Sequence, residues 1–400
     1  MPQLEGGFGL TSDAAGRRVT VETQASLNIF DNVTVLQTDR WARELGLYAD
    51  VELGQELEGR FASFSTPKHL LSSRKMGCAW HPKGEMRMNV DTFPTCPVEF
   101  DGEQCVDTFF GTCFERFFGT GNDVTDFTST EQGQTLLAMM LEKIYQGLGN
   151  SFFDLYNFAS HPLITQANAE AFYRVSIGEW EDYTDQMLSG KCGGLITQLD
   201  ALAAKGERYY DMVIPETDLD IAKNKYTGDV IQLFEDLQEQ ASPELQAAMD
   251  TGVYINGVTR MPVLLVTNDI FKAYKKWITS KAGTNEMAYR YTIENTDGTT
   301  RLAKNILEWD GIPVVRWDAP SRFDAITGAQ SHRAAIVAPQ VFGVLHDVRD
   351  LKQWDGQNLI VEQSKRVQDK GKIFMTTRYR WGAGIANTDF ISMASNILHP

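Results

Sequence analysis

Residues 307–315 read Leu-Glu-Trp-Asp-Gly-Ile-Pro-Val-Val, and residues 372–384 read Lys-Ile-Phe-Met-Thr-Thr-Arg-Tyr-Arg-Trp-Gly-Ala-Gly. In the first stretch, Asp310 and Gly311 predict a tight turn that precedes a strand. The second stretch predicts the longest strand of the chain, which runs into a glycine corner. The apolar residues 334–338 between them predict a further strand. The C-terminal third is therefore expected to be rich in strands.

Upstream of these strands, helical and strand patterns alternate without a regular rhythm. Val263–Val266 predicts a buried strand, and Ile270–Ile278 predicts a short helix capped by the Asn-Asp pair before it. Residues 229–249 predict an amphipathic helix that Pro243 breaks or restarts. This irregular mixture indicates the α+β class.

A longer helix is predicted over residues 129–149. Ser129 and Gln132 form a capping-box pattern at its start. Gly147 and Gly149 mark its expected end. Apolar residues occupy more than one side, so we expect the helix to lie against two surfaces.

The chain ahead of that helix is expected to be extended. Residues from about 51 to 127 are rich in Phe, Pro and Gly and show no sustained helical period, which indicates a loop-like β region. At the N-terminus, Gly6, Gly7 and Gly9 predict a flexible arm. The start has neither the basic residues nor the apolar stretch of a secretory signal, so the cysteines are expected to begin as thiols in a reducing cytosol.

The composition excludes several classes of protein. The chain has 400 residues, with 37 Lys and Arg against 53 Asp and Glu, so its formal net charge is −16. Its apolar and charged fractions are those of a globular protein, and its length predicts two or three lobes. A strongly acidic chain is not typical of nucleic-acid-binding proteins, which neutralise phosphates with clustered Lys and Arg. The apolar runs are far shorter than the roughly 20 residues of a membrane span.

Catalytic motifs are mostly absent. The sequence has no phosphate-binding loop, zinc-protease helix or nucleophile elbow, and Ser72–Lys75 spells Ser-x-x-Lys without the rest of an acyl-transfer site. Asp218 and Asp220 offer carboxylates for a hard cation, but a solvated loop is the favoured interpretation. The six histidines show no pair at ligand spacing and are interpreted as structural or surface residues. No catalytic residue and no cofactor are assigned.

The cysteines form the clearest local cluster. Cys78, Cys96, Cys105 and Cys113 lie within one stretch, and Cys192 lies apart. With His81 they offer ligands for zinc, although the spacing does not match paired Cys-x2-Cys knuckles. Disulfides formed after the chain leaves the cytosol are a second alternative. Buried or idle thiols are the favoured interpretation.

The order of these features resembles the major capsid proteins of tailed bacteriophages, the Hong Kong 97 fold family. Residues 307–315, followed by the strand at 334–338, are similar to that family's Gly-Ile-Pro-Val passage. Residues 376–385 resemble its closing strand and glycine corner, and residues 262–274 resemble the strand and helix of its axial lobe. The resemblance covers most of the chain in order.

The resemblance implies an α+β capsid fold of the Hong Kong 97 type. The parts that it implies are an N-terminal arm (1–55), an extended β loop (56–127), a peripheral lobe with the spine helix (128–160), an axial lobe (161–340) and the return strands of the peripheral lobe (341–400). The extended loop is rich in phenylalanines, which are expected either to anchor an interface or to join the subunit's own core. They are Phe93, Phe100, Phe109, Phe110, Phe114, Phe117 and Phe118.

The function implied by the resemblance is structural rather than enzymatic. Many copies would assemble as hexamers and pentamers into the icosahedral head shell of a double-stranded DNA phage, a virion shell built in the host cytoplasm. Decoration, scaffold and portal proteins are implied partners, DNA is enclosed without sequence-specific binding, and no membrane is involved. Two alternatives stay open: the shell of an encapsulin-like nanocompartment, and a cytosolic metalloenzyme using Asp218, Asp220 and the cysteine cluster.

Overall fold

A computed structural model gives the fold of the chain. It describes residues 9–12, 18–22, 41–42, 44–54, 58–65, 87–105, 131–177, 192–205, 212–255, 258–282, 290–294, 300–347, 359–363 and 372–396. Its α-helices are α3 (Glu131–Phe158), α4 (Gln166–Ile177), α6 (Leu195–Ala204), α7 (Val230–Gln240), α8 (Pro243–Thr251), α9 (Asn268–Ala282) and α10 (Ala319–Thr327). Helices and strands are mixed, as the sequence predicts. Among the described residues, no helix is long and apolar enough to cross a bilayer.

One of the two large sheets has seven strands. In spatial order they are β13 (Arg290–Glu294), β14 (Thr300–Trp309), β15 (Ile312–Arg316), β12 (Val263–Val266), β16 (Arg333–Val337), β20 (Ile391–Ser395) and β7 (Met212–Val213). The predicted buried strand is confirmed, because every residue of β12 is buried. Strand β12 runs parallel to β15 and antiparallel to β16. A strand between two such neighbours carries apolar residues on both faces.

The turns and helices of this part follow the sequence closely. Asp310 and Gly311 both adopt positive φ, 49° and 78°, in the turn that joins β14 to β15. Positive φ at both central residues is typical of a tight hairpin turn. The predicted break at Pro243 is also confirmed, because α7 ends at Gln240 and α8 begins at the proline, where the Ser242 hydroxyl accepts a hydrogen bond from the Leu245 N–H.

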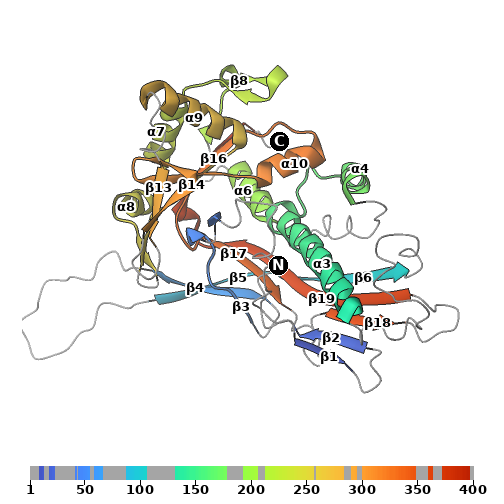
Figure 1. Cartoon of the computed structure of the whole chain (residues 1–400). Helices are drawn as coiled ribbons and strands as arrows, with labels where there is room; N and C mark the ends of the chain where they lie inside the picture. Colours follow the sequence, from blue (N-terminus) through green and yellow to red (C-terminus); the bar gives the residue numbers. More distant parts are fainter. Residues whose placement is uncertain are drawn as a thin grey trace, which may run out of the picture.

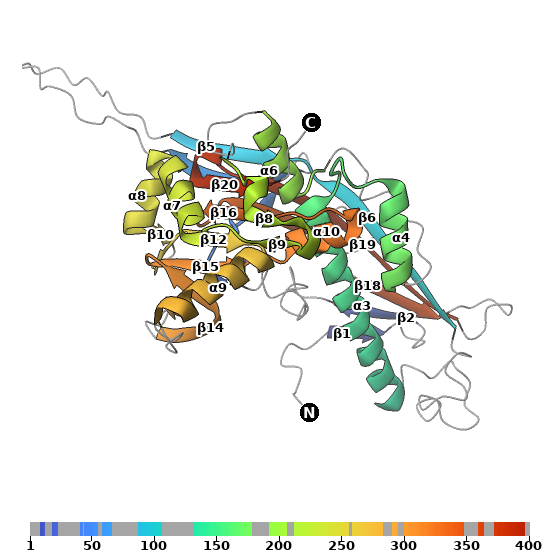
Figure 2. The ribbon, with the colours of Figure 1, turned by 90° about the horizontal axis from the view of Figure 1, so that it is seen from above.

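The other large sheet has six strands and is built from both ends of the chain. They are β1 (Gly9–Ser12), β2 (Arg18–Glu22), β18 (Leu359–Gln363), β19 (Lys372–Ile385) and β17 (Phe342–Asp347), with β6 (Cys96–Cys105) paired to β19. Strand β19 has 14 residues and pairs with β6 from Lys372 to Trp381. Figures 1 and 2 show α3 lying across this sheet.

The predicted glycine corner continues as strand rather than ending it. The ring of Phe93 lies against the backbone of β19 at Gly382 and Gly384. An ideal Cβ at these glycines would lie 2.8 Å and 2.6 Å from ring atoms, inside van der Waals contact. Phe93 is itself buried and packs with Leu345 and Ala386. Because these two glycines have no Cβ atom, the Phe93 ring can lie directly against the backbone of β19.

One prediction near the start of the chain is corrected. The flexible arm predicted from Gly6, Gly7 and Gly9 includes Gly9–Ser12, which is strand β1 and pairs with β2. Strand β2 in turn pairs with β18, so this hairpin extends the six-stranded sheet.

The long helix is also longer than predicted. Gly147 and Gly149 do not end it, because α3 continues to Phe158. A glycine inside a helix costs about 1 kcal/mol relative to alanine. Beyond Gly149 the helix buries large side chains. The free energy gained by transferring them out of water exceeds the cost of the glycines. They are Phe152, Phe153, Leu155, Tyr156 and Phe158. Ser129, the predicted cap, lies outside the described residues.

The last segment of the chain contributes strands to both large sheets. Residues 341–400 were predicted to return to one lobe, but only β17, β18 and β19 join the six-stranded sheet. Strand β20 pairs with β16 in the seven-stranded sheet, from Arg333↔Ser395 to Val337↔Ile391. The buried residues of both sheets belong to one core cluster, except Leu345 of β17, which packs with Phe93 and Ala386.

A third, smaller sheet contains the described part of the predicted loop-like β region ahead of Cys96. It joins β3 (Glu52–Leu53), β4 (Gly59–Ser65) and β5 (Arg87–Phe93). We call these strands the ribbon; Figures 1 and 2 show β4 and β5 extending away from the large sheets. Phe93 at its base lies in the subunit's own core, and Phe100 packs partly against it. The other phenylalanines of the predicted segment lie outside the described residues.

Candidate functional site

A buried ion pair joins helix α6 to strand β16 of the seven-stranded sheet. Asp200 on α6 accepts hydrogen bonds from both terminal nitrogens of Arg333 on β16, of which the Nη2–Oδ2 distance is 2.8 Å. The His161 Nε2 lies 2.9 Å from the same Oδ2. All three residues are buried. Bidentate geometry and a third partner are what a buried charge pair needs to offset its loss of hydration.

A second ion pair fixes the long helix. Asp154, 1% exposed on α3, binds Arg322 of α10 through two hydrogen bonds, with Nη2–Oδ2 at 2.6 Å. The Arg322 guanidinium also lies 5.4 Å from the ring centroid of Phe172 on α4. Asp154 lies beyond the helix end predicted from the glycines. The continuation of α3 therefore carries both apolar anchors and a charged one.

A third pair links the start of α9 to β16. The His332 Nδ1 lies 2.5 Å from Asp269 Oδ2, which also accepts from the Tyr226 N–H at 3.1 Å. Burial works to raise the pKa of Asp269, but hydrogen bonds from His332 and Thr267 outweigh burial and hold that pKa below its usual value. His161 and His332 are thus both buried and both paired with an aspartate.

Asp324 on α10 is a partly buried carboxyl that is held by Ser331. Its oxygens accept hydrogen bonds from the Ser331 N–H at 3.0 Å and the Ser331 hydroxyl at 2.6 Å. Burial raises the pKa of Asp324 to about 6, against the lowering effect of those hydrogen bonds. The folded protein therefore holds a proton on Asp324 at pH values where the unfolded chain does not.

This shift predicts a pH dependence of stability. Because the folded pKa is raised, the contribution of Asp324 is fully present below about pH 4 and is lost as the pH rises through about 6. At 1.36 kcal/mol per pKa unit, it amounts to roughly 2–3 kcal/mol. We expect Asp324→Asn to remove this pH-dependent loss of stability. Urea unfolding of the wild type and the variant between about pH 4 and pH 6 measures it. Parallel pH profiles would contradict the shift.

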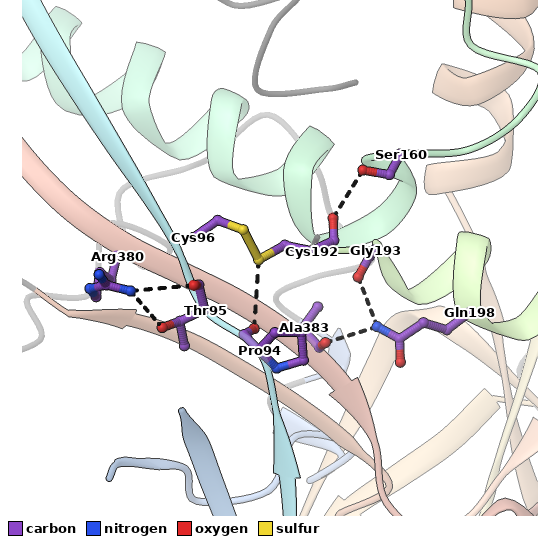
Figure 3. The surroundings of a disulfide bond; sticks show 9 residues. All are labelled: Pro94, Thr95, Cys96, Ser160, Cys192, Gly193, Gln198, Arg380 and Ala383. Atoms are coloured by element: carbon purple, nitrogen blue, oxygen red, sulfur yellow. Dashed lines mark hydrogen bonds between the residues drawn. A yellow bond between two sulfur atoms is a disulfide. The ribbon is translucent and has the colours of Figure 1, made fainter. Parts of the chain in front are cut away.

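A disulfide ties β6 to the segment ahead of α6. Cys96 and Cys192 are joined, with Cα atoms 6.1 Å apart and a sequence separation of 96 (Figure 3). Ser160, at the turn after α3, donates its hydroxyl to the Cys192 carbonyl at 3.2 Å. The Gln198 side chain donates to Gly193 and to Ala383 of β19 at 2.7 Å and 2.8 Å. The bond therefore lies where the six-stranded sheet, α3 and α6 meet.

Of the cysteine cluster predicted from sequence, only Cys96 and Cys105 lie in the described part of the chain, and the favoured interpretation as thiols is wrong for Cys96 and Cys192. Cys96 is bonded to Cys192, the one cysteine that the cluster left out. Cys105 ends β6, where it is paired with Lys372 in the ladder. Cys78, His81 and Cys113 lie outside the described residues, so zinc at the cluster stays a prediction. No spacing signal connects Cys96 with Cys192, because the fold alone brings them together.

The two aspartates considered for a cation lie at a short hairpin of β8 (Leu219–Asp220) and β9 (Lys225–Tyr226): Asp218 ends the 3-10 helix just ahead of it, and Asp220 lies in β8. The Asp220 carboxylate pairs with Lys223 at 3.1 Å, and the hydrogen bond from Lys223 lowers its pKa. The Asp218 carbonyl accepts from the N–H groups of Thr227 and Gly228. In the described part of the chain, no group of three His, Cys, Asp or Glu residues could hold a metal ion.

Comparisons with known proteins find likeness only in structure. No family model matches the chain, and no curated protein matches it. The capsid of Ralstonia phage GP4 is 12% identical at a TM-score of 0.44, over 88% of this chain and 86% of that one. The satellite phage P4 procapsid is 9% identical at 0.42, over 90% and 98%. The SrpI encapsulin complex from Synechococcus elongatus is 10% identical at 0.38, over 91% and 90%. Phage capsid proteins are the kind of protein that the sequence resemblance named.

Proposed function

We propose that this chain is the subunit of a self-assembling protein shell, the major capsid protein of a tailed phage. The observation that carries the proposal is the ribbon of β3, β4 and β5, which belongs to neither large sheet and extends from the body (Figure 1). Its base is anchored by Phe93, which lies between the ribbon and β19. Beyond the two residues of β3, the ribbon is a two-stranded hairpin of β4 and β5, which is marginally stable in water unless another surface covers it. A neighbouring copy supplies that surface in a shell.

The arrangement of the remaining elements supports the same proposal. The long helix α3 lies across the sheet that contains the long strand β19, and the seven-stranded sheet forms a second body with its own helices (Figure 2). We propose that the ribbon belongs to the extended loop, residues 56–127, and that the two large sheets belong to the peripheral and axial lobes. The proposed lobe boundaries are those predicted from sequence, except that β20 joins the axial sheet.

The charge balance suits a container. A wall with a net charge of −16 per copy does not adhere to packed DNA, which can then enter and leave. We propose that hexamers and pentamers close an icosahedral head around double-stranded DNA without sequence-specific binding. Scaffold, portal and decoration proteins are its proposed partners, and the virion, assembled in the host cytoplasm, is its proposed location. We propose no catalytic reaction for the chain.

Particle formation tests the proposal. The purified chain is expected to elute from a sizing column at megadalton mass and to form closed shells in negative stain. A sample that stays monomeric or forms a small oligomer at high concentration would contradict the shell. The same measurement separates the shell from the metalloenzyme alternative.

The contents of native particles test the finer claim. Particles isolated from the cells that make the protein are expected to contain nuclease-protected double-stranded DNA. Shells that hold an enzyme and no DNA would contradict a phage head and support the nanocompartment alternative.

A further inference from the structure

An open groove on the seven-stranded-sheet side of the molecule is lined by lysines. It has a volume of about 860 Å³ and lies between the β8–β9 hairpin and α9. Its exposed cations come from both elements, and Tyr226 and Trp277 form part of its wall. We call it the basic groove, and its lysines are Lys223, Lys225, Lys272 and Lys276.

The acids that line the basic groove are already engaged. Asp269 binds His332 and the Tyr226 N–H. Asp229 caps α7 by accepting from the Ile231 and Gln232 N–H groups. Among the described residues, no ion pair involves Lys272 or Lys276. Four lysines and two aspartates line the groove, and Lys223 also binds Asp220, so the groove carries a moderate excess of positive charge on a strongly acidic protein.

A second surface, between α7 and α8, carries the opposite charge. A hollow of about 420 Å³ is lined by Glu235, Gln238 and Glu239 of α7 together with Gln246 and Asp250 of α8. We call it the acidic face. Gln246 donates to the Gln238 carbonyl at 3.2 Å, which holds the two helices together. No lysine or arginine lines this hollow.

The charges on the two surfaces have matching spacing. Glu235 and Glu239 are four residues apart on α7, and Lys272 and Lys276 are four residues apart on α9. Each pair therefore lies on one side of its helix with a rise of about 6 Å. A helix of one copy laid along the groove of another would bring both pairs together.

Within one chain the two surfaces face different ways. Helix α7 packs its buried side on α9, where the Phe234 and Tyr274 rings lie 5.3 Å apart. Figures 1 and 2 show α7 between α8 and α9, so the acidic face and the basic groove flank it on different sides. A contact between two different surfaces of identical chains is heterologous and closes into rings when the rotation allows.

We propose that the basic groove of one copy binds the acidic face of the next copy. This inference rests on the proposed function, because it assigns one contact of the shell. Copies with a net charge of −16 repel one another, and a local pairing of opposite charges overcomes that repulsion and sets the relative orientation of the copies. Exposed pairs are screened by salt, so assembly is expected to weaken as ionic strength rises.

Charge reversal tests the contact. Lys272→Glu with Lys276→Glu, and separately Glu235→Lys with Glu239→Lys, are each expected to raise the protein concentration for half-maximal assembly at least tenfold. Combining all four changes restores opposite charges across the contact and is expected to restore assembly. Light scattering measures the concentration dependence. Thermal melting of the unassembled subunits checks that the variants fold.

A matched control separates the contact from net charge. Lys205→Glu removes an exposed lysine at the end of α6, outside the groove, and is compared with Lys272→Glu alone. Equal effects of these two changes would overturn the inference. So would a quadruple variant no better than the double variants.

The outcomes distinguish this inference from the proposed function. If the wild type forms shells and the reversals change nothing, the inference alone fails. If the wild type forms only small rings that the reversals disrupt, the contact stands and the shell fails. If the wild type does not self-associate, both fail. Binding of a DNA oligonucleotide that Lys272→Glu abolishes, with assembly unchanged, would assign the groove to a polyanion and overturn the contact.

Discussion

Asp200→Asn is expected to lower the free energy of unfolding by about 3–5 kcal/mol. The substitution keeps the shape of the side chain and removes its charge. Arg333, fully buried on β16, is then left without a counter-ion, and His161 loses its carboxylate partner. An uncompensated buried charge cannot regain its hydration while the protein stays folded. Urea unfolding of the unassembled subunit at neutral pH measures the loss.

A second Arg–Asp pair in the same protein is the control for this prediction. Arg316 binds Asp318 through two hydrogen bonds, of 2.7 Å and 3.4 Å, but the arginine side chain is 42% exposed. Exposed pairs of this kind contribute about 0–1 kcal/mol. Asp318→Asn is therefore expected to cost less than 1 kcal/mol. Equal losses for the two variants would show that burial of the Asp200 pair does not determine its effect.

Replacing both Asp200 and Arg333 tests whether the uncompensated buried charge causes the loss of stability. A buried ion pair replaced by apolar residues of similar volume is often neutral in stability. Asp200→Leu with Arg333→Met is therefore expected to recover most of the stability that Asp200→Asn loses. A double variant as unstable as the single one would point to lost packing rather than to an uncompensated charge.

Cys192→Ala is expected to lower the free energy of unfolding by about 2–5 kcal/mol. The disulfide closes a loop with a sequence separation of 96. Opening a loop of that size releases much conformational freedom in the unfolded chain. In the folded state, loss of the disulfide also releases β6 from the junction of α3 and α6. Denaturant unfolding under oxidising conditions measures the change.

Reductant and alkylation supply the controls for the disulfide. Dithiothreitol is expected to destabilise the wild type and to leave Cys96→Ala with Cys192→Ala unchanged. Cys105→Ala, which removes a cysteine outside this bond, is expected to keep the sensitivity to reductant. If iodoacetamide modifies Cys96 and Cys192 in the unreduced folded protein, the bond is absent and the prediction fails.

Local features of the sequence predicted several elements accurately. Val263–Val266 is a buried strand, Asp310 and Gly311 form the turn, and Pro243 begins a new helix. Each depends on a few neighbouring residues, through apolar periodicity, positive φ at Asp-Gly or the missing N–H of proline. The helix at 129–149 was also found, although its end was not.

The errors share one cause. Gly149 is a local stop signal, yet α3 continues because the aromatic residues after it are buried in the core. The glycines at the N-terminus indicated a flexible arm, yet Gly9–Ser12 belongs to a hairpin that pairs through β2 with β18, more than 300 residues away in sequence. In both cases a distant segment outweighs the local preference.

The candidate site depended almost wholly on distant contacts. Nothing near Asp200 in the sequence indicates that Arg333, 133 residues later, is its partner, and Cys96 and Cys192 carry no spacing signal. The charges of the basic groove and the acidic face are visible in the sequence as helix residues. Their placement on two sides of α7 is not.

By itself, the sequence determined the mixed class, the acidic charge, the buried strand of Val263–Val266 and the turn at Asp310 and Gly311. These depend on the intrinsic geometry of a few adjacent residues. The tertiary structure alone decided the length of α3, the use of β20 in the second sheet, the Cys96–Cys192 bond and the burial of Arg333 beside Asp200. The physical reason is that burial and pairing free energies belong to contacts between segments, and the fold brings those segments together.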